Sequence, residues 1–215
     1  MNQAELESKC QAIYDEAADF SYRYGDVVTH GLNILLGRPI AQAKLMIVSF
    51  QGTGDDLGLD EHTGKPRRTW PEELLYMNED YPCGDILFQK MQKFGLRDVL
   101  LDETVAAHVV FPQSPEAENR PWKGEYKTDP DSPYAQWKNF SREKCRELIL
   151  MVQPSALLVL GREAEKGLNI GKHDPHYGEF ELEGIKGIYS HQLSKGWTHE
   201  GLDRCFSAVK GLIPH

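Results

Sequence analysis

Residues 142–164 read REKCRELILMVQPSALLVLGREA and combine two helical segments with one strand. Apolar residues recur at steps of three and four along 141–153, which predicts an amphipathic helix with Ser141 as its N-cap. These apolar residues are Cys145, Leu148, Ile149 and Val152. The short apolar run at 155–160 predicts a buried strand, and Gly161 ends it before a second helix. This order is typical of a sheet with parallel strands.

The same alternation of helices and apolar runs continues on both sides of this stretch. Apolar runs predict further strands at 44–50, 104–111 and 184–190. Amphipathic spacing predicts helices at 3–20, 84–95 and 199–212. Continuously apolar strands are buried on both faces of a sheet. We therefore expect an α/β protein, a three-layer α/β/α sandwich around a mostly parallel sheet of about four strands.

Length and composition narrow the class of protein. The chain has 215 residues, of which 40% are apolar and 27% are charged, and this length suits one core, so residues 1–215 are expected to form a single domain. No apolar window approaches the ~18 residues that a membrane span needs, and the N-terminus is polar. The sequence therefore predicts a soluble, cytoplasmic protein without a membrane partner.

Charge and cysteine content argue against several kinds of site. The net charge of −9 counts against a large nucleic-acid footprint, because Lys and Arg dominate phosphate binding. The four cysteines form no CxxC pair and are expected to be reduced thiols. The histidines near the C-terminus fit no zinc pattern, so we expect no metal site.

Polar, glycine-rich and aromatic residues follow each predicted strand. Gln51–Asp56 follow the first strand, Phe111 and Pro112 end the second, and Gly161 and Arg162 follow the third. His191 follows the fourth. Because ligands bind beyond the carboxyl ends of parallel strands, we expect a site there. Two long irregular stretches, at roughly 53–83 and 112–140, are expected to carry function as well.

Five segments, taken in order, resemble the uracil-DNA glycosylase superfamily. They are SFQGTG at 49–54, GDILFQKM at 84–91, AAHVVFPQSP at 106–115, the stretch 142–164, and SHQLSKG at 190–196. The resemblance runs from about residue 44 to residue 212, so the N-terminal helix within 1–25 lies outside it. It implies an enzyme that hydrolyses the N-glycosidic bond of a flipped-out, modified base in single-stranded or duplex DNA, with no cofactor.

The resemblance also implies roles for individual residues. Gln51 matches the first motif and would position the attacking water, with Asp55 or Asp56 supplying a carboxylate. His191 matches the histidine of the last motif and would donate to the departing base. The implied substrate-binding residues are Gly52, Tyr81, His108, Phe111, Ser194 and Lys195. Of these, Tyr81 or Phe111 would stack the base, His108 lies near the position that reads its edge, and Ser194 and Lys195 belong to the DNA-contacting loop.

Each of these residues also has a purely structural interpretation. Gln51–Gly54 can be a tight turn, and Asp55 and Asp56 can be ordinary solvated carboxylates. His108 can be a hydrogen-bonded core histidine, and Tyr81 can pack on the helix at 84–95. His191 can be satisfied by a neighbouring carbonyl group.

Three classes of function therefore stay open. The first is a DNA glycosylase. The second is a non-catalytic binder of nucleic acid or protein, favoured by the absence of the family's proline after Gln51 and by the net charge. The third is a hydrolase of a small nucleoside-like molecule, which an acidic surface also suits. A basic cluster at Lys65–Arg68, beside Trp70, is a further candidate for phosphate contact or an exposed loop.

Overall fold

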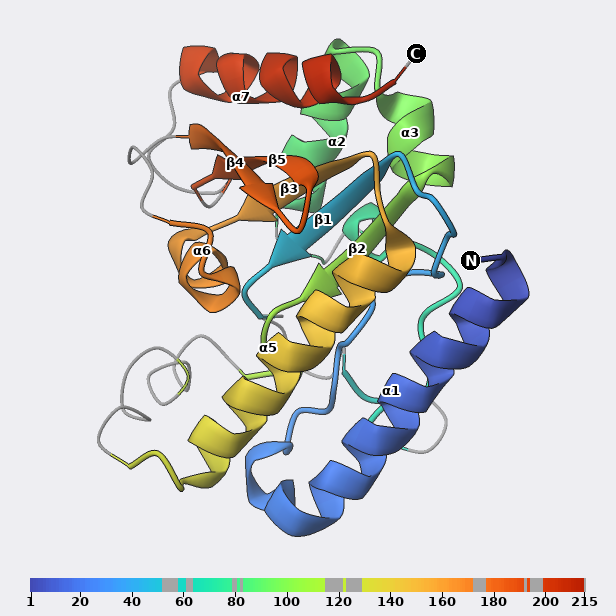
Figure 1. The fold of residues 1–215 in the computed structure, drawn as a ribbon, viewed down its shortest axis with the longest axis vertical. Helices are drawn as coiled ribbons and strands as arrows, with labels where there is room; N and C mark the ends of the chain where they lie inside the picture. Colours follow the sequence, from blue (N-terminus) through green and yellow to red (C-terminus); the bar gives the residue numbers. More distant parts are fainter. Residues whose placement is uncertain are drawn as a thin grey trace.

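The computed structural model describes most of the chain (Figure 1). The described residues are 1–51, 58–60, 64–78, 81, 83–114, 122, 129–171, 177–191, 193 and 199–214. Within them the protein is α/β, with helices packed on a mostly parallel sheet.

Five strands form the sheet in the order β2-β1-β3-β5-β4. The strands are β1 (Leu45–Ser49), β2 (Thr104–His108), β3 (Ala156–Leu160), β4 (Tyr177–Leu182) and β5 (Ile185–Ser190). β1 pairs in parallel with β2 and β3, and β3 pairs in parallel with β5. β4 pairs antiparallel with β5 at the edge of the sheet. The four predicted strands are thus confirmed, and the parallel arrangement holds for all of them.

The fifth strand, β4, is absent from the sequence prediction, which expected about four. β4 alternates exposed Glu179 and Glu181 with the more buried Phe180 and Leu182, as a half-exposed edge strand does. The turn to β5 places Glu183 and Gly184 at φ angles of 53° and 80°, which is the conformation of a tight hairpin turn. The sequence of β4 does alternate polar and apolar residues, but its two glutamates made the segment look unlike the apolar runs that predicted the other strands.

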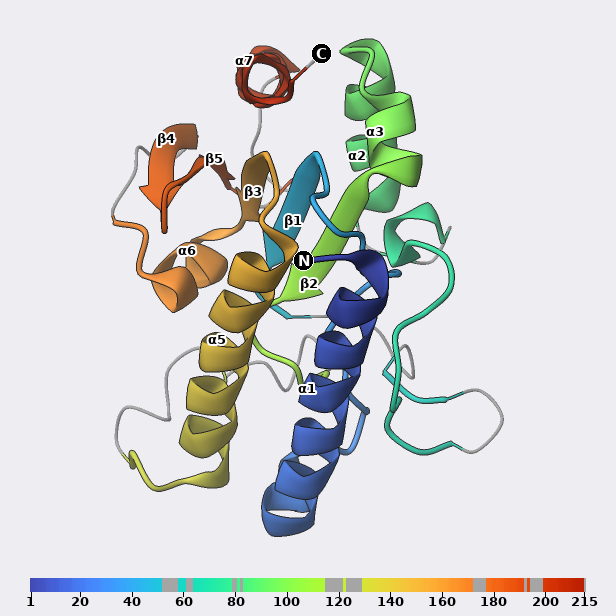
Figure 2. The same cartoon turned by 45° about the vertical axis from the view of Figure 1, so that its right-hand side comes forward.

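Helices lie on both sides of the sheet. They are α1 (Gln3–Tyr24), α2 (Gly84–Lys93), α3 (Arg97–Asp102), α5 (Pro133–Val152), α6 (Arg162–Leu168) and α7 (His199–Leu212), with short 3-10 turns at Gly25–Val27 (η1) and Leu75–Met77 (η2). Figures 1 and 2 show α2, α3 and α7 on one side and α1, α5 and α6 on the other. α3, which the sequence analysis did not predict, leads directly into β2.

Alternate residues of each strand join two separate hydrophobic clusters. In β1, Leu45 and Ile47 pack with residues of α2, α3 and α7, whereas Met46 and Val48 pack with residues of α1 and α5. This alternation follows from the period of two in a strand. Every β1 residue from Leu45 to Val48 is fully buried, which explains the unbroken apolar run in the sequence.

α1 begins where the sequence predicted and extends four residues further than 3–20. The Asn2 side chain accepts a hydrogen bond from the Glu5 backbone N–H at 2.9 Å, so it caps the helix. α1 lies beside α5, and Glu16 forms an ion pair with Lys144 at 2.7 Å across the two helices.

The start of α5 corrects the sequence prediction, which placed it at Ser141. The helix begins at Pro133, and the Ser132 side chain accepts from the Ala135 backbone N–H as its N-cap. Proline fits the first helical position because its fixed φ is helical and the missing N–H has no partner there anyway. Ser141 lies buried within α5, and its hydroxyl accepts a hydrogen bond from the Phe111 backbone N–H at 3.2 Å.

The outer edge of β2 is covered by a segment that precedes β1. Leu35 forms an isolated antiparallel bridge with Ala107. On either side of this bridge the Leu36 N–H donates to the Ala106 carbonyl, and the His108 N–H donates to the Ile34 carbonyl. The strand that carries His108 is thereby held on both sides.

Candidate functional site

The carboxyl ends of the four parallel strands are in register along one edge of the sheet. In the strand register Ser49 is opposite both His108 and Leu160, and Leu160 is opposite Ser190. Neighbouring strands are about 4.8 Å apart, so the ends of β1 and β5 are separated by roughly 10 Å, with β3 between them. The residues that follow these strands, Gln51 and His191 among them, therefore leave the sheet at the same edge, as the sequence analysis expected of parallel strands.

Gln51 is anchored at this edge, and one end of its carboxamide has no hydrogen-bond partner among the described residues. The side chain is 9% exposed, and its Nε2 donates to the Pro112 carbonyl, at the end of the segment that follows β2. Its Oε1 is buried and accepts no hydrogen bond from the part of the chain that the structure describes. A buried acceptor without a partner costs about 1–3 kcal/mol, so the position is expensive for a purely structural residue. The atom is suited to accept a hydrogen bond from a water or a ligand N–H.

His108, Ser49, Tyr76 and Tyr81 form a hydrogen-bond network at the carboxyl ends of β1 and β2, the sheet edge at which Gln51 also lies. The His108 Nδ1 lies 2.8 Å from the Ser49 hydroxyl, and its Nε2 lies 3.0 Å from the Tyr81 hydroxyl. Tyr76 donates to the Ser49 hydroxyl at 3.2 Å. The two tyrosine rings pack edge to face with centroids 5.0 Å apart. The strands β1 and β2 supply two members of this network, and the segment 75–81 supplies the others.

Burial keeps the network neutral. His108 is 1% exposed, and desolvation lowers the pKa of its imidazole from 6.5 to about 3. Burial raises the pKa of Tyr76 to about 12, and it raises the pKa of Tyr81 well above 10. Each group is therefore uncharged near pH 7 and works through hydrogen bonding.

Among the described residues, this network has one more hydrogen-bond donor than it has hydrogen bonds. Each of its four neutral groups carries one O–H or N–H proton, and the network has three hydrogen bonds. With the proton of His108 on Nε2, the spare O–H belongs to Tyr81. With the proton on Nδ1, it belongs to Ser49. The edge of the sheet thus offers an acceptor on Gln51 and one hydroxyl donor, on Tyr81 or on Ser49.

Two of the other predicted residues are rings inside the protein, and the third follows β5 as predicted. Phe111 is fully buried, and its ring packs edge to face on Phe140 with centroids 6.3 Å apart. The Tyr81 ring is 6% exposed, so both candidate stacking rings lie inside the protein. His191 is half-buried directly after β5, where its carbonyl accepts from the Ser190 hydroxyl at 3.0 Å.

Several predicted residues lie outside the described part of the chain. They are Gly52, Asp55, Asp56, Ser194 and Lys195. Of the predicted site, the structure therefore brings Tyr81 and His108 into direct contact and places Gln51 and His191 at the same sheet edge.

Two members of the network were missed by sequence reasoning. Ser49 is the last residue of β1 and opposes His108 in register, so the strand prediction held the information for that contact. Tyr76 lies in η2, within a stretch that was interpreted as irregular, and no local pattern indicates its partner.

The described residues show neither a metal centre nor a membrane-spanning helix. They contain no group of three or more His, Cys, Asp or Glu side chains arranged to hold a metal ion. None of the helices there is long and apolar enough to span a membrane.

Comparison with known proteins adds no relative to this description. No protein-family model matches the chain, and no curated protein matches it.

Proposed function

We propose that this chain is a uracil-DNA glycosylase-like enzyme that removes a modified base from DNA by hydrolysing its N-glycosidic bond. The proposal includes the finer fold, a three-layer α/β/α sandwich. One observation carries the function: the Gln51 carboxamide, buried and anchored beyond β1, with Oε1 unpartnered within the described residues. A fixed acceptor at the carboxyl end of a central strand is what a water-positioning residue requires.

In the proposed reaction Gln51 orients water and does not remove its proton. A water O–H donates to Oε1, and this leaves an oxygen lone pair for attack on the sugar carbon as the bond to the base breaks. An amide has no basic character at neutral pH, so the water proton passes to a carboxylate, for which Asp55 and Asp56 are the candidates. His191, at the end of β5, donates to the oxygen of the departing base anion.

The buried network gives Tyr81 and His108 a role different from the one the resemblance implied. Both are buried: His108 contacts the Ser49 hydroxyl through Nδ1 and the Tyr81 hydroxyl through Nε2. We propose that they act as positioning residues, and that the spare hydroxyl hydrogen of the network binds an acceptor on the base. Phe111 supports the backbone beside them through its bond to Ser141.

The test is single-turnover incubation with labelled oligonucleotides that carry uracil or other modified bases, single-stranded and duplex, followed by alkaline cleavage of abasic sites. We expect product from the wild type, and a rate at least ~100-fold lower for Gln51→Ala and His191→Ala. Gln92→Ala, an exposed amide on α2, is the matched control and should keep the wild-type rate. Folded variants that release base as fast as the wild type would refute the assigned roles.

The acidic net charge of −9 favours a second candidate, a hydrolase of small nucleoside-like molecules. Incubation with free nucleosides, followed by chromatography of the released base, separates the two. Release from nucleosides alone would support the second candidate. Binding of DNA with no release from any substrate would instead support a non-catalytic binder.

A further inference from the structure

Two cationic stripes face one another on α5 and α6. Arg142 and Arg146 are four residues apart on α5, and Arg162 and Lys166 are four residues apart on α6. Residues with this spacing lie on one face of a helix, about 6 Å apart along its axis. We call these four residues the α5–α6 cationic surface.

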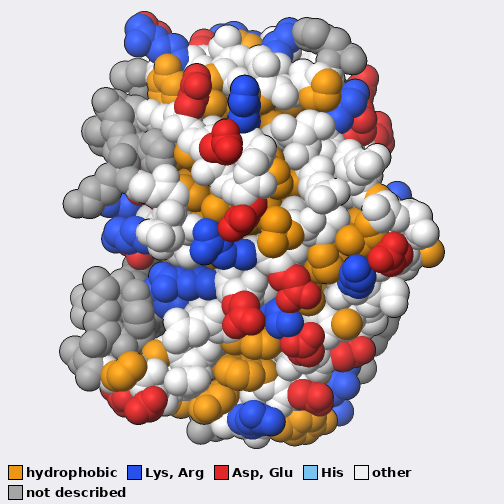
Figure 3. Space-filling model, viewed as in Figure 1, with side chains coloured by type: hydrophobic (Ala, Val, Ile, Leu, Met, Phe, Trp, Pro, Cys, Tyr) orange, Lys and Arg blue, Asp and Glu red, His pale blue; other side chains and the backbone are white. Residues whose placement is uncertain are grey.

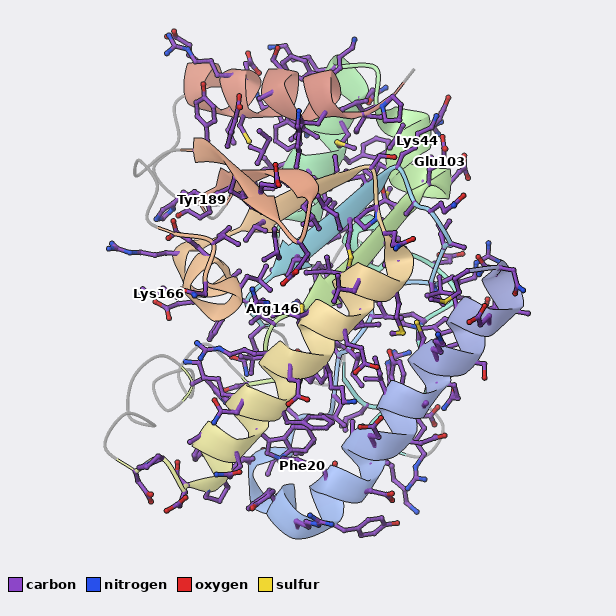
Figure 4. All side chains as sticks on the ribbon, in the orientation of Figure 1. Phe20, Lys44, Glu103, Arg146, Lys166 and Tyr189 are labelled. Carbon is purple, nitrogen blue, oxygen red and sulfur yellow. The ribbon has the colours of Figure 1, made fainter. Side chains whose placement is uncertain are left out.

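Close packing brings the two stripes together. A Cβ on Gly167 of α6 would lie 2.4 Å from Cγ1 of Val109 and 3.7 Å from Nε of Arg142. The absence of that carbon lets α6 approach the sheet and α5, and Arg142 lies against α6 as a result. Figure 4 shows Arg146 on α5 beside the helix that carries Lys166. The Lys and Arg atoms form a band over α6 and the adjoining part of α5 in Figure 3.

Nearby carboxylates neutralise this surface only in part. Lys166 forms an i,i+3 ion pair with Glu163 at 2.5 Å, and Arg146 lies 3.9 Å from Glu183, at the limit of an ion pair. Glu165 of α6 is buried and has an interaction partner, as Arg142 does, so the three carboxylates Glu163, Glu165 and Glu183 stand against four cationic side chains. Arg162 is exposed and forms no ion pair with any residue that the structure describes. A chain with a net charge of −9 thus has a local excess of positive charge here.

We propose that the α5–α6 cationic surface binds the phosphodiester backbone of a nucleic acid. Three of its four members are arginines, whose planar guanidinium group matches phosphate oxygens in a bidentate manner. The surface also reaches the edge of the sheet that carries the candidate site, because Arg162 comes two residues after the end of β3, and β3 lies between β1 and β5, which Gln51 and His191 follow. A backbone held here passes the edge where a base would enter.

The alternative basic cluster at Lys65–Arg68 lacks the aromatic face expected of it. Trp70 is half-buried and packs edge to face on Tyr14 of α1, with centroids 6.2 Å apart. The Arg68 carbonyl accepts from Gln11 of the same helix. These contacts tie the segment to α1, so a base has no free indole to stack on there.

Binding is measured by fluorescence anisotropy with labelled oligonucleotides of ordinary bases, single-stranded and duplex, at several salt concentrations. The double variant Arg162→Gln/Lys166→Gln removes two charges from the surface. The control, Lys9→Gln/Arg97→Gln, removes two exposed charges from α1 and α3. Because each phosphate contact releases counterions, we expect the surface variant to bind ~10- to 50-fold more weakly at about 50 mM salt. Its slope of log K against log salt should be shallower by about 1.4 for single strands.

Equal loss in both double variants would overturn the proposal, since the effect would then come from net charge. Wild-type protein that binds no oligonucleotide would also overturn it. Titration with inorganic pyrophosphate distinguishes the source of phosphate: binding as tight as that of an oligonucleotide would assign a small-anion site instead. The inference rests on the proposed function for its partner, but the oligonucleotides carry no scissile base. If the surface variant loses oligonucleotide binding but the wild type releases no base from any substrate, the surface proposal stands and the proposed function fails. If the wild type releases base but the surface variant binds oligonucleotides as tightly as the wild type, the surface proposal fails.

Discussion

Replacing His108 with glutamine removes a buried titratable group from the network at the sheet edge. In the folded protein the imidazole has a pKa of about 3, because burial disfavours its charged form. In the unfolded chain a histidine has a pKa of about 6.5. The folded state therefore stays neutral over a range in which the unfolded state takes up a proton.

The sign and size of the effect follow from this difference. The contribution of His108 to stability is complete above about pH 6.5 and is lost as the pH falls toward 3. Between about pH 7 and about pH 4.5 the wild type loses about 2.5 kcal/mol of unfolding free energy through this one group. His108→Gln lacks that loss, so the stability gap between the wild type and the variant should narrow by about 2.5 kcal/mol.

Urea unfolding followed by tryptophan fluorescence measures this gap at each pH. Carboxylates common to both proteins cancel in the comparison, provided that both unfold in two states. Tyr81→Phe is the control, because it removes a hydrogen-bond partner but keeps the buried imidazole and so should keep the wild-type acid dependence. Parallel pH dependences for the wild type and His108→Gln would refute the reasoning.

Three further predictions test the packing and the caps by urea unfolding. Gly167→Ala should destabilise the fold by about 2 kcal/mol, because its Cβ would lie 2.4 Å from Val109; an unchanged midpoint would contradict the close approach of α6. Ser132→Ala should cost about 1 kcal/mol by removing the N-cap of α5, and hydrogen exchange should rise in the first turn rather than near Ser141. Gln51→Glu should lower the free energy of unfolding by about 2 kcal/mol at neutral pH, because a carboxylate oxygen replaces the Nε2 donor to the Pro112 carbonyl. A variant as stable as the wild type would contradict that hydrogen bond.

Local patterns predicted most of the fold because the strands are buried on both faces. A short apolar run such as 155–160 that is flanked by helices indicates a buried strand, and β3 does occupy Ala156–Leu160. The start of α5 was misplaced because prolines at 115–133 suggested an irregular segment, although a proline at the first helical position favours a helix. Whether residues 133–140 form a helix or a loop depended on Ser132 acting as the N-cap, and the local sequence alone did not distinguish these two structures.

Only those features of the site that follow from the arrangement of the strands could be predicted from the sequence. Parallel strands place Gln51 and His191 at one edge, and this follows from topology alone. That His108 contacts Tyr81 depends on where η2 and the segment after it return to the sheet, which is a tertiary property. The burial of Phe111 likewise arises from α5 extending back to Pro133, so that Phe140 covers the ring.

The two lateral edges of the sheet also bear on how copies of this protein meet. On one side the segment that includes Leu35 covers β2, so its hydrogen-bonding groups are already used. On the other side β4 is the outermost strand and carries exposed Glu179 and Glu181. Two such strands brought together would place like charges opposite each other, which disfavours strand addition. The edge strand that the sequence analysis missed thus protects the sheet against edge-to-edge aggregation.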